Sequence, residues 1–274
     1  MYSPPTDAAD QQRTLAAQDE AATALGVTIH GPPRWGHQGR TLGQPAHHPL
    51  HGPCWLRLTC TPADKTGGKL WDGTQDAATA FPTVNKPALH AVYDGTVRDK
   101  LAWRAELTQH VDTPVCSPEP VLSHELDLPG NWWNSLRADL ETIATTATDR
   151  VAVRQQWIER AVPAHTGRPA PVIEHWQTAH GDCHFANLTT SGPVLLDFEG
   201  FGLAPAGYDP AMLYTYSLLA PKTAARVRTE FPVLNSLSGQ AALLVVIADL
   251  LQSASRGDHP ELTRPLRAML TTLP

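Results

Sequence analysis

Apolar residues recur at helical spacing in several separate stretches of the chain. One set recurs at intervals of four and three residues: Trp132, Leu136, Leu140 and Ile143. This spacing predicts a helix with one buried face. Further helices are predicted over residues 8–25, 151–162 and 239–255. Gly26 is expected to cap the first of these. The expected core of the last helix is Leu243, Val246, Ile247, Leu250 and Leu251.

A different texture fills the first part of the chain. From residue 27 to residue 61, short apolar patches are broken by Gly and Pro, and residues 54–58 alternate between apolar and polar. This pattern predicts a small antiparallel sheet. A short helix is expected over 71–81, and two more strands within 93–111 around a turn at Asp94-Gly95. Strands followed by helices predict an α+β fold.

Composition narrows the class of protein. Of the 274 residues, 42% are apolar and 18% are charged, which is typical of a folded globular chain long enough for two packed lobes. The net charge is −6, and no run of Lys or Arg is present. This balance argues against a nucleic-acid partner. An anionic ligand must therefore be held locally, by a metal ion or by individual cations.

Cysteine usage and the apolar runs indicate a compartment. The four cysteines are sparse and form no CxxC pair, which favours reduced thiols in the cytoplasm. Residues 1–9 lack the basic start and apolar core of a secretory signal. The longest apolar run, Ala241–Ile247, is too short to cross a bilayer. We therefore expect a cytoplasmic protein without a membrane partner.

One polar segment, over residues 180–203, interrupts the helical texture of the second half. Asp182 and Asn187 have the D-x-x-x-x-N spacing of a kinase catalytic loop. Asp197 follows ten residues after Asn187, at the end of an apolar strand and directly before Phe198. A turn at 191–192 predicts a hairpin that returns Asp197 to the side of Asn187.

These residue types suit phosphoryl transfer, which depends on positioning and on neutralising charge around the moving phosphate. Mg²⁺ prefers oxygen ligands such as carboxylates and amides. Asn187 and Asp197 are therefore the expected metal ligands, and Asp182 the catalytic carboxylate that accepts the proton of the attacking hydroxyl. Glu199 is expected to add a contact to the metal or to the groups around it.

The motif HGDxHxxN, followed by an apolar strand and Asp-Phe-Glu, resembles the aminoglycoside phosphotransferase and choline kinase superfamily. Gly181 stands where protein kinases carry arginine. The segment 207–210, which opens an apolar helix, is similar to the one that follows the metal-binding aspartate in that superfamily. The resemblance implies that Asp209 caps this helix and braces the catalytic loop. His180 and His184 are expected to support the loop, His180 through hydrogen bonds.

The resemblance also implies an architecture and an activity. We expect a bilobal protein-kinase-like fold, with a β-rich nucleotide-covering lobe over residues 1–111 and a helical lobe over 112–274 that bears the acceptor site. ATP, with GTP as the alternative, is expected to bind between the lobes with Mg²⁺. The γ-phosphate would pass to a hydroxyl of a small molecule. Acceptors in the superfamily include aminoglycosides, choline, homoserine and methylthioribose.

Residues of the first lobe fit this scheme less closely. The resemblance identifies residues 35–40 as the loop over the nucleotide, in which Gly36 and Gly39 would let the backbone approach phosphate. They fit ordinary hairpin glycines equally well. Arg57 stands where a strand lysine is expected and would contact the phosphates. The acid that pairs with this cation stays open between Asp72 and Asp76, and residues 106–111 are expected to connect the lobes.

Other functions compete with this interpretation. Asp182, Asn187 and Asp197 are also typical capping and turn residues around a hairpin. The missing strand lysine favours a pseudokinase that binds nucleotide or acts as a scaffold. The same fold also suits an enzyme that transfers AMP to a protein. One further group has residue types that bind zinc, although its spacing fits no standard zinc finger. Its members are His37, His47, His48, His51 and Cys54.

Overall fold

The computed structural model describes residues 3–36 and 39–273 and divides into two compact units. Unit 1 comprises Met1–Thr79 and Pro87–Asp112, and unit 2 comprises Ala80–Lys86 and Thr113–Pro274. The short segment 80–86 differs from the expected division at residue 111. It groups with unit 2 because the ring of Phe81 packs 4.9 Å from that of Phe201, and the Asn85 carbonyl accepts the Leu195 N–H at 2.8 Å.

Unit 1 is an antiparallel sheet between two helices. Its helices are α1 (Ala8–Leu25) and α2 (Lys69–Ala80), the last residue of which belongs to unit 2. Its strands are β1 (Thr28–Ile29), β2 (Arg34–Trp35), β3 (Thr41–His48), β4 (Gly52–Pro62), β5 (Leu89–Asp94) and β6 (Leu101–Gln109). The strand order is β1-β3-β4-β6-β5, and β2 also pairs with β3. The predicted antiparallel sheet is confirmed.

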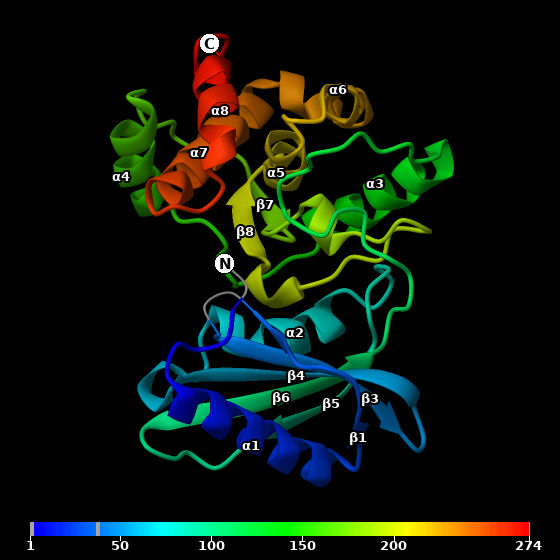
Figure 1. Cartoon of the computed structure of the whole chain (residues 1–274). Coiled ribbons are helices and arrows are strands. Elements are labelled where there is room, and N and C mark those ends of the chain that lie inside the picture. The colour runs from blue at the N-terminus through cyan, green and yellow to red at the C-terminus, as the bar shows by residue number, and fades with distance from the viewer. Residues whose placement is uncertain (1–2, 37–38, 274) are drawn as a thin grey trace. The chain divides into compact units, whose positions relative to one another are not determined.

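One face of this sheet forms a core with α1, which Figure 1 shows along the sheet. The helix begins where Asp7 accepts the Ala9 N–H at 2.7 Å and ends at Gly26, whose φ is 67°. Its predicted bounds are therefore confirmed. Alternating side chains of β4 and β6 fill the core beneath it: Cys54, Leu56, Leu58, Trp103, Ala105 and Leu107.

The other face of the sheet carries charge. Arg104 of β6 is buried there and donates to Asp94 at 2.7 and 2.9 Å and to Asp72 of α2 at 2.7 Å. It also donates to the Trp71 carbonyl at 3.0 Å and lies over the Trp71 ring. A buried guanidinium is tolerated only with such partners. Arg104 thus fastens the start of α2 to the sheet.

The predicted turn at Asp94-Gly95 is wrong. Gly95 N–H donates to the Trp103 carbonyl at 2.8 Å, so the pairing of the two strands continues past this point. The chain reverses instead at Asp99 and Lys100, whose φ values are 50° and 64°. Two successive positive φ values are the geometry of a tight hairpin turn, which the residue types at 99–100 do not signal strongly.

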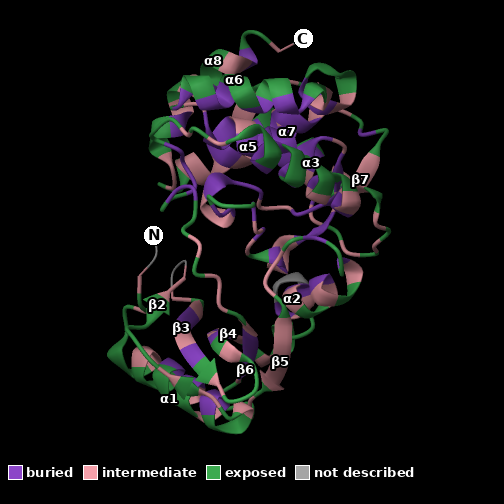
Figure 2. Ribbon diagram, turned by 90° about the vertical axis from the view of Figure 1, so that its right-hand side faces the viewer, coloured by how far each residue is buried: buried purple, intermediate pink, exposed green. Residues whose placement is uncertain are grey.

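Unit 2 is mainly helical around a two-stranded ribbon. Its helices are α3 (Gly130–Thr145), α4 (Gln155–Thr166), α5 (Tyr208–Tyr216), α6 (Pro221–Glu230), α7 (Leu237–Ser255) and α8 (Thr263–Leu270). Its strands β7 (Trp176–Ala179) and β8 (Gly202–Pro205) pair antiparallel. All five predicted core residues of α7 are buried, and Figure 2 shows α5 and α7 largely buried.

Among the described helices, α7 is also the one long and apolar enough to cross a membrane by length and composition. The apolar stretch is therefore longer than the run 241–247 that the sequence suggested. Half of the apolar window is buried within the protein, and α7 packs against α4 and α5. These contacts identify α7 as the core helix of unit 2.

The helix predicted over 151–162 begins four residues later. Val151 forms a bridge with Leu203, and the N–H groups of Ala152 and Val153 both donate to the Leu203 carbonyl at 3.0 Å. The backbone of residues 151–153 is therefore satisfied by β8, which prevents the first turn of a helix from forming there.

Candidate active site

Residues 180–187, called the catalytic loop for their expected role, connect β7 to a short hairpin within unit 2. Residues 185–187 form a single 3₁₀ turn, and the hairpin that follows contains one bridge, between Leu188 and Leu195. At its open end the Leu196 N–H donates to the Asn187 carbonyl at 2.9 Å. Asp197 follows with a φ of 62°, a left-handed conformation that few non-glycine residues adopt. The hairpin thus brings the backbone of Asn187 beside the residue that precedes Asp197.

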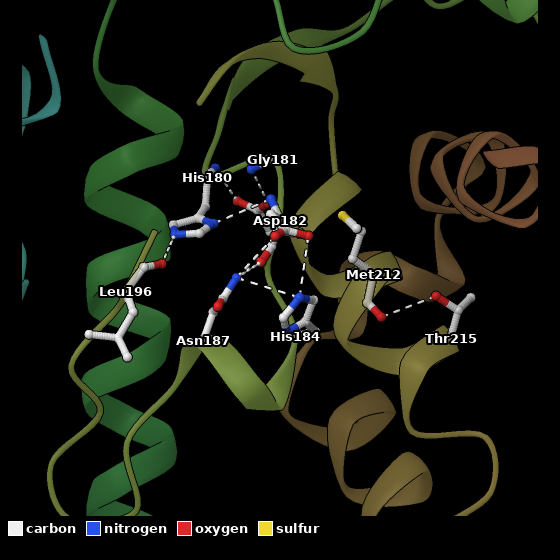
Figure 3. A network of polar contacts seen from close by, with 9 residues as sticks. His180, Gly181, Asp182, His184, Asn187, Leu196, Met212 and Thr215 are labelled. Atoms are coloured by element: carbon white, nitrogen blue, oxygen red, sulfur yellow. Dashed lines mark hydrogen bonds and ion pairs between the residues drawn. The ribbon is translucent and has the colours of Figure 1, made fainter. Parts of the chain in front are cut away.

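The amide of Asn187 is oriented by Asp182. Its Nδ2 donates to the Asp182 carbonyl at 2.9 Å and to Asp182 Oδ2 at 3.1 Å (Figure 3). Turning the amide over would set its oxygen against two acceptors, so these contacts fix its orientation. Within the described part of the chain, no hydrogen bond reaches Asn187 Oδ1. An oxygen able to bind a metal is therefore left available.

Asp182 is half-exposed, with 43% of its side chain accessible. Burial of part of the group opposes ionisation, but the net pKa lies below the ordinary value of an aspartate because attraction by His184 and His180 and the hydrogen bond from Asn187 outweigh it. His184 Nε2 lies 3.4 Å from Asp182 Oδ1. Asp182 is consequently a carboxylate at neutral pH.

His180 connects the loop to the strand that carries Asp197. Its Nδ1 accepts the Asp182 N–H at 3.3 Å, which leaves Nε2 to donate to the Leu196 carbonyl at 2.9 Å. Its ring also lies edge-to-face with Phe198 at 4.5 Å. Figure 3 shows the imidazole between the two segments. These hydrogen bonds join the loop to the segment that precedes Asp197.

Asp209 braces the same loop from α5. Its two carboxylate oxygens accept the N–H groups of His180 at 2.7 Å and Gly181 at 3.0 Å. Burial raises the pKa of Asp209 above its ordinary value, and these contacts offset only part of that shift. The prediction that Asp209 caps α5 is wrong, because Gly207 occupies the N-cap position and Asp209 lies in the first turn of the helix.

Gly181 has a geometric reason to be glycine. Its φ is 86°, and a Cβ at this position would lie 2.7 Å from the Gly200 carbonyl oxygen. A side chain here would strain the backbone and collide with the segment after Asp197. The position that carries arginine in protein kinases is therefore closed to larger residues in this chain.

Glu199 lies in a 3₁₀ turn, Phe198–Gly200, and is held through its backbone. Arg150 donates to the Glu199 carbonyl at 2.9 Å and to the Phe201 carbonyl at 3.1 Å, and its guanidinium lies 4.3 Å from the Phe201 ring centre. Sequence reasoning missed Arg150, because nothing in the local pattern indicates which arginine contacts a distant turn.

The two glycines expected over the nucleotide lie in the β2–β3 hairpin of unit 1. The Gly36 N–H donates to the Thr41 carbonyl at 2.9 Å, and the Gly39 N–H to the Gly36 carbonyl at 3.2 Å. His37 and Gln38 lie outside the described residues. A Cβ on Gly39 would lie 2.6 Å from Pro5, so its small size is also needed for packing. The hairpin geometry is compatible with a loop over the nucleotide and equally with an ordinary hairpin.

Arg57 of β4 stands directly opposite Glu106 of β6 in the sheet. Its Nη1 lies 3.8 Å from Glu106 Oε2, and Glu106 is only 4% exposed. An acid close to Arg57 is thus supplied by the adjacent strand, whereas Asp72 of α2 binds Arg104. Residues 106–109 belong to β6, so the expected connection over 106–111 begins later, at His110.

Three histidine rings lie close together beside the β3–β4 hairpin. The ring of His51 stacks on that of His90 at 4.2 Å and lies 4.6 Å from that of His48. Among the residues that the structure describes, no group of three or more His, Cys, Asp or Glu side chains is arranged to hold a metal ion. Cys54 is buried in the core beneath α1. These positions give the zinc hypothesis no support.

Residues 108–243 match the family described as phosphotransferase enzyme family, APH. Over this segment, just under half of its length, the chain is similar to that family. The matched residues contain the whole catalytic loop, Asp197 and Asp209. A search of curated proteins found no match.

Solved structures share the fold of this chain. Amicoumacin kinase hAmiN, determined with AMP-PNP, Ca²⁺ and Ami, is 10% identical, with a TM-score of 0.60 over 93% of each chain. A candidate aminoglycoside phosphotransferase from Ralstonia eutropha JMP134 is 11% identical, with a TM-score of 0.52 over 94% of this chain and 95% of that one. The predicted α+β, kinase-like fold is confirmed.

Proposed function

We propose that this protein is a magnesium-dependent small-molecule kinase that transfers the γ-phosphate of ATP to a hydroxyl group. The observation that carries the proposal is the arrangement of Asn187 and Asp182 within one hydrogen-bonded loop. Asn187 turns its N–H groups to Asp182 and keeps Oδ1 available, while Asp182 keeps a half-exposed carboxylate. An oxygen ligand and a proton acceptor thus stand side by side.

The donor set fits Mg²⁺ better than a softer metal. Asn187 Oδ1 and the exposed carboxylate of Asp197 are hard oxygen donors, and Glu199 is near in sequence. Mg²⁺ is commonly held by one or two protein oxygens together with substrate phosphates. The ion would therefore arrive with the nucleotide and neutralise charge on its phosphates. The hAmiN complex contains both AMP-PNP and Ca²⁺, which supports this pairing of nucleotide and hard cation for the fold.

Asp182 is the proposed catalytic residue. Its carboxylate would accept a hydrogen bond from the acceptor hydroxyl and take the proton as the oxygen attacks phosphorus. The bracing of the loop by Asp209 and His180 keeps this carboxylate at a fixed position. Arg57, Gly36 and Gly39 are the proposed contacts for the nucleotide phosphates. The net charge of −6 favours a cationic acceptor over an anionic one.

Thermal unfolding with ATP, GTP or ADP, each with and without Mg²⁺, tests the nucleotide site without a known acceptor. A ligand that binds the folded state raises the midpoint, by linkage. We expect a magnesium-dependent shift with ATP that Asp197→Ala abolishes. The matched control is Asp127→Asn at an exposed aspartate, which should keep the shift. No shift at millimolar nucleotide in the wild type would contradict the proposal.

The released product separates the proposed activity from its rivals. Kinases that bind ATP productively also transfer phosphate slowly to water, so ADP should accumulate with Mg²⁺ and without an acceptor. Adenylyl transfer would release pyrophosphate instead, and a pseudokinase would release neither. Screening hydroxyl-bearing amines for faster ADP release would then identify the acceptor class.

A further inference from the structure

His184 is a buried histidine beside the proposed catalytic carboxylate. It is 4% exposed, and its Nε2 lies 3.4 Å from Asp182 Oδ1. Its ring meets that of Tyr216 edge-to-face at 5.2 Å, which holds the imidazole in one plane. Figure 3 shows His184 and Asn187 approaching Asp182 from neighbouring positions. The Asp182 carboxylate therefore has one neighbour for each oxygen.

The hydrogen bonds around His184 identify where its proton sits. Nδ1 is buried and has no hydrogen-bond partner among the described residues. A proton on Nδ1 would leave a buried N–H unsatisfied, which is less tolerable than an unused acceptor. Asn187 Nδ2 also lies 3.5 Å from Nε2, but its two N–H groups make shorter contacts to Asp182, at 2.9 and 3.1 Å, so Nε2 is left to donate to the carboxylate. The favoured imidazole carries its proton on Nε2, directed at Asp182 Oδ1.

We propose that His184 is a positioning residue, whose Nε2–H holds Asp182 Oδ1 while Asn187 holds Oδ2. The proposal rests on the function proposed above. With both oxygens held, the carboxylate cannot rotate about its last side-chain bond, and its remaining lone pairs point in a fixed direction toward the acceptor hydroxyl. A separation of 3.4 Å exceeds the usual range for an N–H···O bond. We infer that the contact shortens when the acceptor binds, as catalytic hydrogen bonds often do.

The proposal separates two measurable quantities. His184 lies beside Asp182 Oδ1 and approaches Asn187 only through the Nδ2 group that Asp182 already holds, so its loss should lower turnover without weakening nucleotide binding. Loss of orientation at a catalytic group lowers rates by about 10- to 100-fold. A purely structural histidine would instead affect the unfolding midpoint and leave the rate per folded molecule unchanged.

Three variants test this arrangement through magnesium-dependent ADP release and the thermal shift with Mg·ATP. His184→Phe keeps the ring against Tyr216 but removes both nitrogens. His184→Gln keeps an N–H at nearly the reach of Nε2, and His184→Asn carries the same amide one carbon short of it. We expect about 10- to 100-fold lower kcat for Phe and Asn, near wild-type kcat for Gln, and unchanged Mg·ATP binding in all three. His124→Phe, at an exposed position, is the control.

Each outcome is decisive. Equal kcat values for the Gln and Asn variants, or wild-type kcat for the Phe variant, would overturn the positioning role. If the Phe variant does not fold, the Gln and Asn pair still decides, because both introduce the same amide. Absence of Mg·ATP binding in the wild type would instead remove the proposed function. The two failures are therefore distinguishable.

Discussion

The catalytic loop of unit 2 and the residues expected to hold nucleotide in unit 1 are built in different ways. In unit 2, Asp182, Asn187 and His180 are joined by hydrogen bonds of 2.9–3.3 Å within a few residues of one another. In unit 1, Arg57 lies 3.8 Å from Glu106, a residue on another strand. The first arrangement is local and closely held, whereas the second depends on strand register.

This difference explains why chemistry is easier to recognise in one region. A loop that positions side chains through its own backbone needs particular residue types at fixed spacing, and these remain visible in the sequence. A phosphate-binding hairpin acts through backbone N–H groups, which every residue except proline supplies. The following variants test whether the two regions also differ in what they contribute to activity.

The largest effect is expected for Asp182→Ala. Removal of a general base lowers turnover by about 10²- to 10⁴-fold. Since Asp182 is not a proposed metal ligand, the thermal shift with Mg·ATP should persist. ADP release and the unfolding midpoint measure the two quantities on the same preparation, with Asp127→Asn as the control. Full activity of the Ala variant on an identified acceptor would exclude Asp182 from the mechanism.

Gly181→Ala tests how closely the loop is held. The left-handed backbone alone costs an alanine about 1–2 kcal/mol, and the contact at 2.7 Å with the Gly200 oxygen adds to this. The matched control is Gly167→Ala, because Gly167 has a φ of 71° but nothing within 4 Å of its Cβ position. Denaturant unfolding should show a clearly larger loss for Gly181→Ala. Equal losses in the free energy of unfolding would mean that the loop accommodates the added methyl group at little cost.

Arg57→Ala tests the region that the sequence describes less well. If the guanidinium contacts phosphate, its loss removes charge-assisted hydrogen bonds worth about 1.5–3 kcal/mol, or roughly 10- to 100-fold in Mg·ATP affinity. Arg57→Lys should recover part of that affinity, because lysine keeps the charge but not the fork. Arg98→Ala, on an exposed arginine of the same unit, serves as the control. Calorimetric titration with AMP-PNP and Mg²⁺ measures all four proteins, and unchanged affinity in Arg57→Ala would exclude the contact.

Much of the fold could be predicted from the sequence, because helix periodicity and caps act locally. Residues 8–25 form a helix ended by Gly26, and the predicted core face of α7 is buried. Two predictions failed for different reasons. Residues 151–153 are not helical because they pair with Leu203, which is distant in sequence. The turn lies at Asp99-Lys100 and not at Asp94-Gly95 because the residue types at 99–100 do not signal a tight turn strongly.

For the site, residue types were predicted but not all of their neighbours. The HGDxHxxN spacing indicated the loop, but Arg150 and Phe81, which contact the turn after Asp197, are distant in sequence and carry no local signal. Glu106 had a signal that was not used: like Arg57, it is a charged residue inside a mainly apolar strand and therefore requires a partner. Pairing such charges across predicted strands would have suggested the contact.

The smallest effect is expected in thiol labelling, which compares the two regions directly. Burial raises the pKa of Cys60 on β4 to about 11, with Asp10 adding to the shift, and raises that of Cys183, next to Asp182, well above its ordinary value. Thiolates are the reactive form, so both should react slowly at pH 8. Cys60 is only partly buried and Cys183 is fully enclosed, so Cys60 should react first. Cys60→Ser should remove that phase, and labelling of Cys183 at a similar rate would show that the catalytic loop opens as readily as the C-terminal part of β4.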